Sequence, residues 1–332
     1  MVRRVSAPEL VTLGEAFEDL VFLGLDCLPR PGEEVKTSAF VRTVGGGAVI
    51  TAVAASRLGL ACGVWSGLGD DAAVRLSAEG VGVANFRRAG EPHAITAALS
   101  TRADRSFVTF NGINDQLEGR LLDALPRLET RHAHFALYPH DCARWERAVG
   151  ELRRRGVTTS WDFGWNEGLV RDRGFIPLLR ALDFVFVNER EARLYAQRHT
   201  LPAALDAWRS FERAIIVKLG ARGSRWLSQR TDLHVPAPRV KPVDTTGAGD
   251  AFNGGFLAAW LRGLAPSACL RLGNFVGANS TRAAGGLDGL PTDREVPVPL
   301  RRSIGRTGSP AAPGAAASPR RTGRRLPSKG QA

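Results

Sequence analysis

The segment from Val243 to Phe256 combines small residues, four glycines and two carboxylates in an order that could bind an anion and move a proton. Gly247 and Gly249 allow backbone dihedral angles that other residues resist, so successive N–H groups can converge on one point at the start of a helix. Such a helix N-terminus binds anions. Asp250, in the same first turn, would lie beside a bound phosphate and could take a proton from an attacking hydroxyl. The segment therefore predicts phosphoryl transfer.

The whole string, D-T-T-G-A-G-D-A-F-N-G-G-F from position 244, resembles the signature of the ribokinase family, also called pfkB-type carbohydrate kinases. The alternative is an ordinary helix start, in which an acidic first turn favours the macrodipole. That alternative would explain an isolated G-A-G-D, but not the longer string. The resemblance implies that Asp250 is the catalytic base. It also implies that the backbone amides of Gly247, Ala248 and Gly249 form an anion hole for the transferred phosphoryl group.

Further motifs resemble the parts of the family that hold ATP and its cations. In the segment 188–191 the pattern N-x-x-E implies that Glu191 acts through water on the Mg²⁺ that bridges the ATP phosphates. The residues alone leave an alternative, because acidic residues also favour a helix N-terminus. The run K-L-G-x-x-G after position 217 is similar to the family's nucleotide-side loop. The resemblance thus assigns Asn188, Lys218, Gly220 and Gly223 to the nucleotide, and Asp244 and Thr246 to a monovalent cation such as K⁺.

The N-terminal third carries the motifs that the resemblance assigns to a sugar. The spacing from Gly14 to Asp19, followed by P-x-P-G-E, implies that Asp19 binds substrate hydroxyls, since a carboxylate accepts two hydrogen bonds from a vicinal diol. A solvated loop carboxylate is the alternative. The family's second signature, G-G-x-x-x-N-x-A, places Ile50 where relatives carry an Asn, which favours a substrate with fewer hydroxyls or with an apolar portion. The implied substrate-binding residues are Asp19, Gly45, Gly46, Gly47 and Ile50.

Strands and helices alternate along the second half of the chain. Strands are predicted at 132–138, 158–162, 183–188 and 214–219, and helices at 142–155, around 177–181, and at 189–197, 250–262 and 266–283. This alternation predicts an α/β fold with a doubly wound, mostly parallel sheet flanked by helices. Ligands gather at the carboxyl ends of such strands, where Asp162 and Asn188 lie. Asp162 also stands in the place of the family's D-x-N motif, although Gly164 replaces the Asn.

The resemblance adds a small β-sheet lid to this ribokinase-like fold. Two insertions, at about 17–44 and 93–112, are expected to form the lid, and alternating residues from 94 to 110 predict a hairpin within the second. The kinase domain is predicted to span residues 1–299. Because relatives often dimerise through the lid, we expect a homodimer.

His132 and His134 have the spacing that puts two imidazoles on one face of a strand, and His140 follows them. A metal site is therefore one interpretation. No Cys or third ligand with metal-site spacing accompanies these residues. We expect an ordinary sheet strand with polar residues at its ends.

The net charge of +12 over 332 residues raises the question of a nucleic-acid partner. Eight Lys and Arg residues and no acid lie between Arg301 and Ala332, so the rest of the chain carries only about +4. A folded part this mildly basic does not call for nucleic acid. Residues 300–332, rich in Gly, Ala, Pro and Arg, are predicted to be a disordered basic tail.

Cysteine usage and hydropathy indicate the compartment. The four cysteines are far apart and form no C-x-x-C pair, which fits a reducing cytoplasm. No stretch approaches the roughly 18 apolar residues of a membrane span, so we expect a cytoplasmic protein with no membrane partner.

Together these features predict an ATP-dependent carbohydrate kinase whose partners are a small sugar and ATP, with Mg²⁺ and K⁺ as cations. Two alternatives remain open. A nucleoside kinase uses the same catalytic string, and Ile50 favours a less polar substrate. A non-catalytic sugar- or nucleotide-binding regulator could instead act through the basic tail, although the intact Asp250, Gly247 and Gly249 argue against it.

Overall fold

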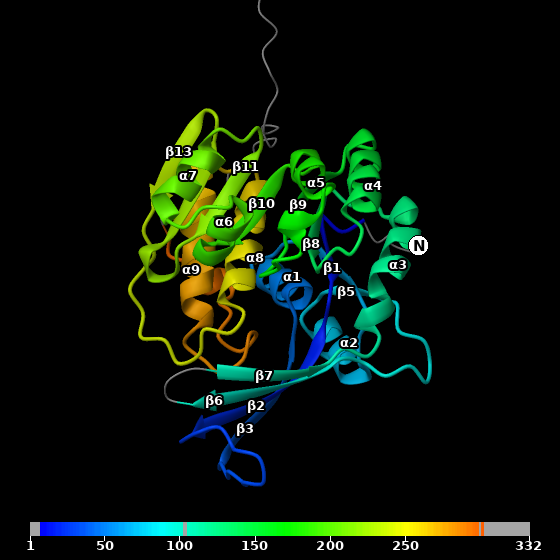
Figure 1. The fold of residues 1–332 in the computed structure, drawn as a ribbon, viewed down its shortest axis with the longest axis vertical. Coiled ribbons are helices and arrows are strands. Elements are labelled where there is room, and N and C mark those ends of the chain that lie inside the picture. Colours follow the sequence, from blue (N-terminus) through cyan, green and yellow to red (C-terminus); the bar gives the residue numbers. More distant parts are fainter. Residues whose placement is uncertain (1–6, 102–104, 299, 302–332) are drawn as a thin grey trace, which may run out of the picture.

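A computed structural model describes residues 7–101, 105–298 and 300–301. Its main sheet has the strand order β13-β12-β11-β10-β9-β8-β1-β4-β5, parallel from β11 to β5, with β12 and β13 added antiparallel at one edge (Figure 1). The strands are β1 (Leu10–Gly14), β4 (Cys62–Ser66), β5 (Gly82–Asn85), β8 (His132–Ala136), β9 (Thr158–Asp162), β10 (Phe184–Asn188), β11 (Ala214–Lys218), β12 (Ser224–Ser228) and β13 (Thr231–Val235).

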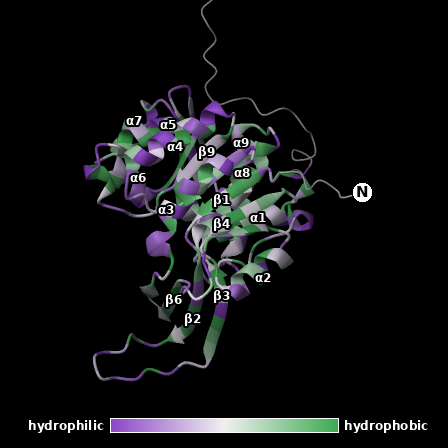
Figure 2. Ribbon diagram, turned by 90° about the vertical axis from the view of Figure 1, so that its right-hand side faces the viewer, coloured by the Kyte–Doolittle hydropathy of each residue, from purple (hydrophilic) through white to green (hydrophobic). Residues whose placement is uncertain are grey.

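Helices cover both faces of this sheet. Alternate strand residues belong to two separate hydrophobic clusters, with Phe184 and Phe186 in one and Val185 and Val187 in the other. The first cluster packs under α1 (Gly47–Arg57), α2 (Asp70–Ala78), α8 (Ala248–Leu261) and α9 (Pro266–Ser280). The second packs under α3 (Asn114–Ala124), α4 (Cys142–Arg154), α5 (Phe175–Ala181), α6 (Glu189–Tyr195) and α7 (Leu201–Arg209). The predicted doubly wound architecture is confirmed, and Figure 2 shows hydrophobic residues gathered around β1, β4, α1 and α8.

The predicted lid is a second, four-stranded sheet that projects from one end of the main sheet (Figure 1). It consists of β2 (Phe17–Leu25), β3 (Ala39–Gly45), β6 (Ile95–Thr101) and β7 (Arg105–Phe110), in the order β3-β2-β6-β7. The β3–β2 and β6–β7 pairs are antiparallel, whereas β2 and β6, which come from the two insertions, run parallel. The predicted hairpin is therefore confirmed, while its turn at 102–104 lies outside the described residues.

Several predicted boundaries differ from the structure by a few residues. The helix predicted at 189–197 ends at Tyr195, because Gln197 adopts a φ of 53°, which an α-helix cannot accommodate. The helix predicted from Asp250 begins earlier, at Ala248, since Gly247 serves as its left-handed N-cap. Of the predicted tail, only Leu300 and Arg301 are described, so its disorder stays a prediction. None of the described helices combines the length and apolar character needed to cross a lipid bilayer.

Candidate active site

The turn before α8 has the geometry expected of an anion hole. Gly247 is the N-cap of α8 and adopts a left-handed φ of 70°; the first amides of a helix have no partner within the helix, although that of Ala248 donates to the Thr245 carbonyl at 3.3 Å. A Cβ at Gly247 would lie 2.5 Å from Ile50 Cδ1 and 3.3 Å from Gly286 Cα. Only glycine therefore satisfies both the backbone angle and the available space. The predicted trio Gly247, Ala248 and Gly249 occupies the N-cap and the first two positions of a 14-residue helix, the end of a helix that favours anions.

Asp250 lies in the first turn of α8, against the N-terminus of α1. A Cβ at Gly47 would lie 3.0 Å from Asp250 Oδ1, and Thr51 donates its hydroxyl to the Asp250 carbonyl at 3.1 Å. Burial and the nearby Asp162 carboxylate raise the pKa of Asp250 to about 7, although the Lys218 ammonium opposes this rise. A carboxyl with a pKa near neutrality is suited to accept a proton during catalysis at that pH.

Asp19 faces the same end of the main sheet from the lid strand β2. A Cβ at Gly45 would overlap the Asp19 carboxylate, and one at Gly46, whose φ is 103°, would overlap the Glu15 carbonyl. These two glycines thus allow β3 to pass close to Asp19. Burial and the neighbouring Asp244 raise the pKa of Asp19 to about 7. The structure therefore brings Asp19 and the glycine pair together, and Asp19 lies partly buried in a strand instead of in a solvated loop.

Ile50 packs behind the anion-hole turn. Only 3% of its surface is exposed, and its Cδ1 is the nearest atom to a Cβ built at either Gly247 or Gly286. Its side chain therefore fills the space that those two glycines leave open, which gives Ile50 a supporting role in the turn.

The Asp244 carboxylate links the turn before α8 to the loop that contains Gly285. Its Oδ1 accepts hydrogen bonds from the Thr246 amide at 2.9 Å and the Thr246 hydroxyl at 2.7 Å, while Oδ2 accepts one from the Gly285 amide at 2.9 Å. The residue is 8% exposed. The two residues predicted to bind a monovalent cation are therefore in direct contact, and they fix the backbone just before the anion hole.

Glu191 takes part in a complete capping box at the start of α6. Asn188 Oδ1 accepts from the Glu191 amide at 3.0 Å, and the Glu191 carboxylate accepts from the Asn188 amide at 2.8 Å and from its Nδ2 at 2.5 Å. The helix-terminus alternative is thus realised in the structure. Burial, followed by the Asp162 charge, nevertheless raises the pKa of Glu191 to about 7, while Lys218 opposes this rise. The Glu191 carboxylate therefore belongs to the same buried group of charges as Asp162, Lys218 and Asp250.

A polar cluster next to Gly249 includes a residue that the sequence analysis did not single out, Asn253. Its Nδ2 donates to Asp162 Oδ2 at 2.7 Å, and the Lys218 ammonium forms an ion pair with the same carboxylate. Asn253 stands three residues after Asp250, on the adjoining helix turn, and this i, i+3 spacing is the only signal that could have indicated it.

A cavity of about 490 Å³ opens beside Ala248 and Gly249, on the side of β11 and α9. Gly223, at φ 95°, allows the chain at Val235 to approach closely, because a Cβ on residue 223 would overlap the Val235 carbonyl. Asn188 is not part of the lining. Predicted residues in the wall are Lys218, Gly220, Gly223, Ala248 and Gly249; residues that the sequence analysis missed include Pro238, Val240, Phe252, Asn274 and Gly277. The volume is in the range of small-molecule sites.

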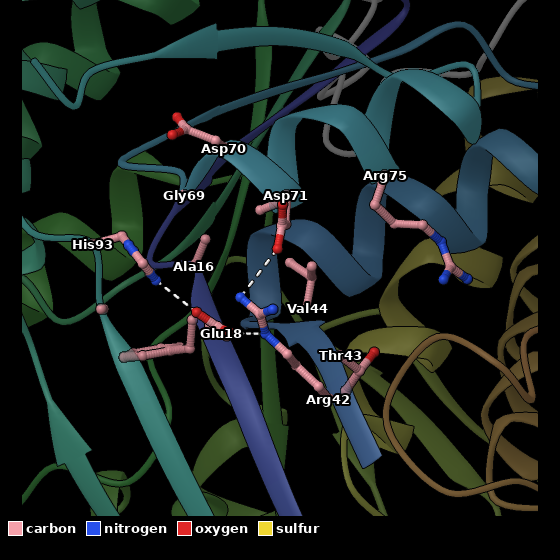
Figure 3. A pocket seen from close by; sticks show the side chains of 13 residues that line it. Ala16, Glu18, Arg42, Thr43, Val44, Gly69, Asp70, Asp71, Arg75 and His93 are labelled. Atoms are coloured by element: carbon pink, nitrogen blue, oxygen red, sulfur yellow. Dashed lines mark hydrogen bonds and ion pairs between the residues drawn. The ribbon is translucent and has the colours of Figure 1, made fainter. Parts of the chain in front are cut away.

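A second cavity, of about 350 Å³, lies where the lid joins the main domain, beside the start of α2 and on the face of the lid opposite Asp19 (Figure 3). Figure 3 shows Glu18 between His93 and Arg42, and Arg42 reaching on to Asp71. Successive residues of a strand point to opposite faces, so this charged cluster is separated from the face that carries Asp19. The cluster joins the lid to α2.

The histidines considered as metal ligands are used in other ways. His132 contacts Thr158 Oγ1 at 2.9 Å and Ser160 Oγ at 2.8 Å, and His134 contacts the same Ser160 oxygen at 2.8 Å. Both imidazoles are fully buried; His132 is the first residue of β8, as expected of a polar residue at a strand end, whereas His134 lies in the middle of the strand. His140 pairs with Glu118. Within residues 7–101, 105–298 and 300–301, no three His, Cys, Asp or Glu side chains are placed to hold a metal ion together.

Comparison with known proteins places the chain in a family. A sequence model of the family described as "pfkB family carbohydrate kinase" matches residues 7–293. The chain is 28% identical over 309 residues to the uncharacterized sugar kinase YegV of Escherichia coli (strain K12), covering 87% of this chain and 95% of YegV. It is also 28% identical over 298 residues to the ribokinase of Bacillus subtilis (strain 168), covering 86% of this chain and 97% of that enzyme.

A solved structure shares the fold. The crystal structure of a putative ribokinase II from Escherichia coli, in complex with ATP and Mg²⁺, superposes with a TM-score of 0.70 at 23% identity. The match covers 90% of this chain and 99% of that one.

Proposed function

The chain belongs to the pfkB family of carbohydrate kinases, and we propose that it transfers the γ-phosphoryl group of ATP to a sugar hydroxyl. The observation that carries this proposal is the convergence of three parts at one end of the sheet: the anion-hole turn, the buried Asp250 carboxyl and the lid carboxylate Asp19. The cavity of about 490 Å³ beside Gly249 would take the nucleotide.

In the proposed reaction Asp250 accepts the proton of the attacking hydroxyl. The hydroxyl oxygen forms a bond to the γ-phosphorus as the bond to the ADP oxygen breaks, and ADP leaves with the electron pair of that bond. The first amides of α8 stabilise the charge on the transferred phosphoryl oxygens, since donors fixed in advance need no reorganisation during the reaction. Asp19 orients the sugar through two hydroxyls.

The charges of the site fit a divalent cation. Asp162, Glu191 and Asp250 place three buried carboxyls around the single ammonium of Lys218, and two of those carboxyls have a pKa of about 7. Such an excess of negative charge favours a bound cation. Mg²⁺ would supply charge neutralisation between the nucleotide phosphates. In the proposal Glu191 holds it through water, and the Asp244–Thr246 turn binds a monovalent cation such as K⁺.

The experiment that tests the proposal is coupled ADP release with Mg-ATP and K⁺ against a panel of sugars, phosphosugars and nucleosides. Turnover of a sugar supports the proposal. Preference for adenosine over ribose and fructose would instead establish the nucleoside kinase. Silence across the panel, together with salt-dependent nucleic-acid binding that is lost on deletion of residues 301–332, would favour the non-catalytic regulator.

The pH dependence of the reaction follows from the raised pKa of Asp250. A base must be deprotonated to act, so activity is present above pH 7 and is lost as the pH falls through about 7, the folded-state value. We expect log kcat/KM, measured with both substrates at low concentration, to decline on the acid side from near pH 7. Because Glu191 titrates in the same range, the midpoint belongs to the coupled pair. A profile that stays flat down to pH 5 would contradict the prediction.

The outer face of the lid supports the proposed homodimer. It carries large hydrophobic side chains, of which Phe40, Val108 and Phe110 are each more than half exposed, and Phe22 packs on Phe40 with ring centroids 5.2 Å apart. A second copy of the same face would cover these side chains. We expect V108D/F110D to shift the molecular mass from dimer to monomer in light scattering, whereas Val74→Asp, at an exposed valine on α2, leaves it unchanged.

A cytoplasmic location is part of the same proposal. The four cysteines carry free thiols, and Cys62, Cys142 and Cys269 are buried. Unpaired cysteines are typical of proteins in reducing compartments.

A further inference from the structure

The face of the lid that carries Asp19 also carries a row of hydroxyl groups. Asp19 on β2 is paired with Thr43 on β3 and with Thr96 on β6, and Thr96 is paired in turn with Thr109 on β7. Side chains of residues that are paired across neighbouring strands point to the same face of a sheet. The carboxylate and the three hydroxyls therefore form one line across all four strands of the lid.

This polar row faces the main domain. A Cβ at Gly285, in the loop after α9, would lie 3.1 Å from Thr43 Cγ2, and a Cβ at Gly45 would overlap the Asp19 carboxylate. Thr96 is only 9% exposed, whereas Thr109, on the edge strand β7, is exposed. The row is thus on the side of the lid that an acceptor substrate would meet.

Three consecutive glycines place the row close to the proposed base. Gly45 lies against the Asp19 carboxylate, and a Cβ at Gly47 would stand 3.0 Å from Asp250 Oδ1. The Cα atoms of residues two positions apart are separated by at most about 7 Å, so one molecule of sugar size can contact both Asp19 and Asp250. Thr96 is on the strand next to Asp19, about 4.8 Å away across the sheet, which is within the width of the same molecule.

Thr96 and Thr109 act as a pair. Their Oγ1 atoms are 3.1 Å apart, and either hydroxyl can be the donor of the hydrogen bond between them. Whichever hydroxyl donates keeps lone pairs that can accept, and the other keeps its own proton to donate. The pair therefore offers one donor and one acceptor to a ligand, which is the combination that a further hydroxyl group can satisfy.

The next row on the same face of the lid is apolar. It consists of the residues two positions away on each strand, which are Val41, Val21, Ala98 and Phe107. The inner face thus presents a single line of polar groups beside an apolar surface. A sugar ring has hydroxyls along its edge and C–H groups on its faces, so it matches this division, in which a few placed polar groups fix the orientation of the ligand.

We propose that Thr96 and Thr109 determine the specificity of the acceptor site, because they bind a further hydroxyl of a polyhydroxylated sugar beside the hydroxyls held by Asp19. The inference rests on the proposed function and deepens it, since it names the class of acceptor. A nucleoside has an aromatic base in place of one sugar hydroxyl, and such rings are bound mainly by apolar and aromatic side chains. The hydroxyl pair therefore selects a sugar over a nucleoside.

The test compares Thr96→Val and Thr109→Val with Thr96→Ser and Thr109→Ser. Valine has the shape of threonine without its hydroxyl, whereas serine keeps the hydroxyl. We expect each valine variant to raise the KM for the sugar about 3- to 10-fold, the effect of losing one neutral hydrogen bond. The contact holds the substrate and the transition state alike, so kcat should stay nearly unchanged. Both serine variants should keep the KM of the intact protein.

Acceptors with and without the hydroxyl identify the contact. D-ribose, D-fructose and adenosine are compared as acceptors, together with the monodeoxy analogues of the sugar that reacts. With the intact protein, one analogue should already show the raised KM, and Thr109→Val should not raise the KM for that analogue further. The KM for adenosine should be the same in the valine variants, so their preference for the sugar over adenosine declines.

The matched control is Thr231→Val, on the edge strand β13 of the main sheet. This variant removes a threonine hydroxyl outside the lid, and it should leave the KM for every acceptor unchanged. Thermal unfolding of each variant, with and without the same sugars, shows that the protein is folded. It also measures sugar binding independently of turnover.

The outcomes separate this inference from the proposed function. Valine variants that keep the KM for the sugar within about twofold of the intact value, or that raise the KM equally for the sugar, all its deoxy analogues and adenosine, overturn the role of the pair while the kinase activity stands. A preference of the intact protein for adenosine overturns it as well. If the intact protein phosphorylates no acceptor, the proposed function fails. In that case a sugar-induced rise in unfolding temperature that only the valine variants lack supports the hydroxyl contact, and the absence of such a rise overturns it.

Discussion

Asp250→Asn is expected to lower kcat by about 10²- to 10⁴-fold, the range typical of losing a general base. The substitution keeps the shape of the side chain, but an amide cannot accept the hydroxyl proton. Because burial already disfavours the carboxylate, the neutral amide should leave the unfolding temperature unchanged or slightly higher. The measurement is coupled ADP release on the substrate identified by the panel, with KM determined for both substrates.

The control for this variant is Asp70→Asn, which removes a first-turn carboxylate from another helix, α2. Asp70 is exposed and pairs with Arg87. The loss of a helix-dipole interaction is therefore common to both variants, whereas only Asp250 faces the anion hole. Near-full turnover in Asp250→Asn would exclude it as the base, and a comparable loss in Asp70→Asn would point to a helix effect.

Gly247→Ala is the second variant with a large expected effect. A methyl group at this position would meet Ile50 Cδ1 at 2.5 Å, and the φ of 70° is unfavourable for alanine. The turn must shift, which moves the amides away from the phosphoryl oxygens. Loss of one well-aligned donor typically costs about 10²- to 10³-fold in kcat, and we expect a decrease of that size with a smaller change in the KM for ATP.

Two companion variants separate steric from backbone effects. Ile50→Val deletes Cδ1, the atom that the new methyl group would strike, so G247A/I50V should regain part of the lost kcat. Gly156→Ala changes a glycine with a φ of 82° at which a Cβ would meet no other atom within 4 Å. Its effect on the free energy of unfolding therefore measures the cost of the backbone angle alone. If G247A/I50V were no more active than G247A, packing against Ile50 would not be the cause of the loss.

The sequence alone determined the parts of the molecule that depend on a few neighbouring residues. The turn at Gly247 needs a left-handed backbone, and the glycine that supplies it is visible in the string. Strand and helix periodicity indicated the α/β class, because burial on both faces of a parallel sheet requires apolar runs between helices. The resemblance of the same string to a known signature added the family and the role proposed for Asp250.

The tertiary structure decided what residues distant in the chain do together. Asp162 and Asn253 are 91 residues apart and meet because the last residue of β9 lies beside the first half of α8. The sequence could assign Lys218 to the nucleotide, but not its buried partner. Likewise, the sequence places Ile50 in a predicted substrate-binding motif, but its packing against Gly247 and Gly286 is visible only in the structure.

The parallel pairing of β2 with β6, which joins two separate insertions into one lid, shows the same limit. Local propensity describes each strand, but not which strand it pairs with. Backbone angles and periodicity are properties of short segments, and a sequence displays them directly. Strand order, close approach and charge balance depend on how those segments pack, and here the packing places Asp162, Lys218 and Asp250 in one buried site.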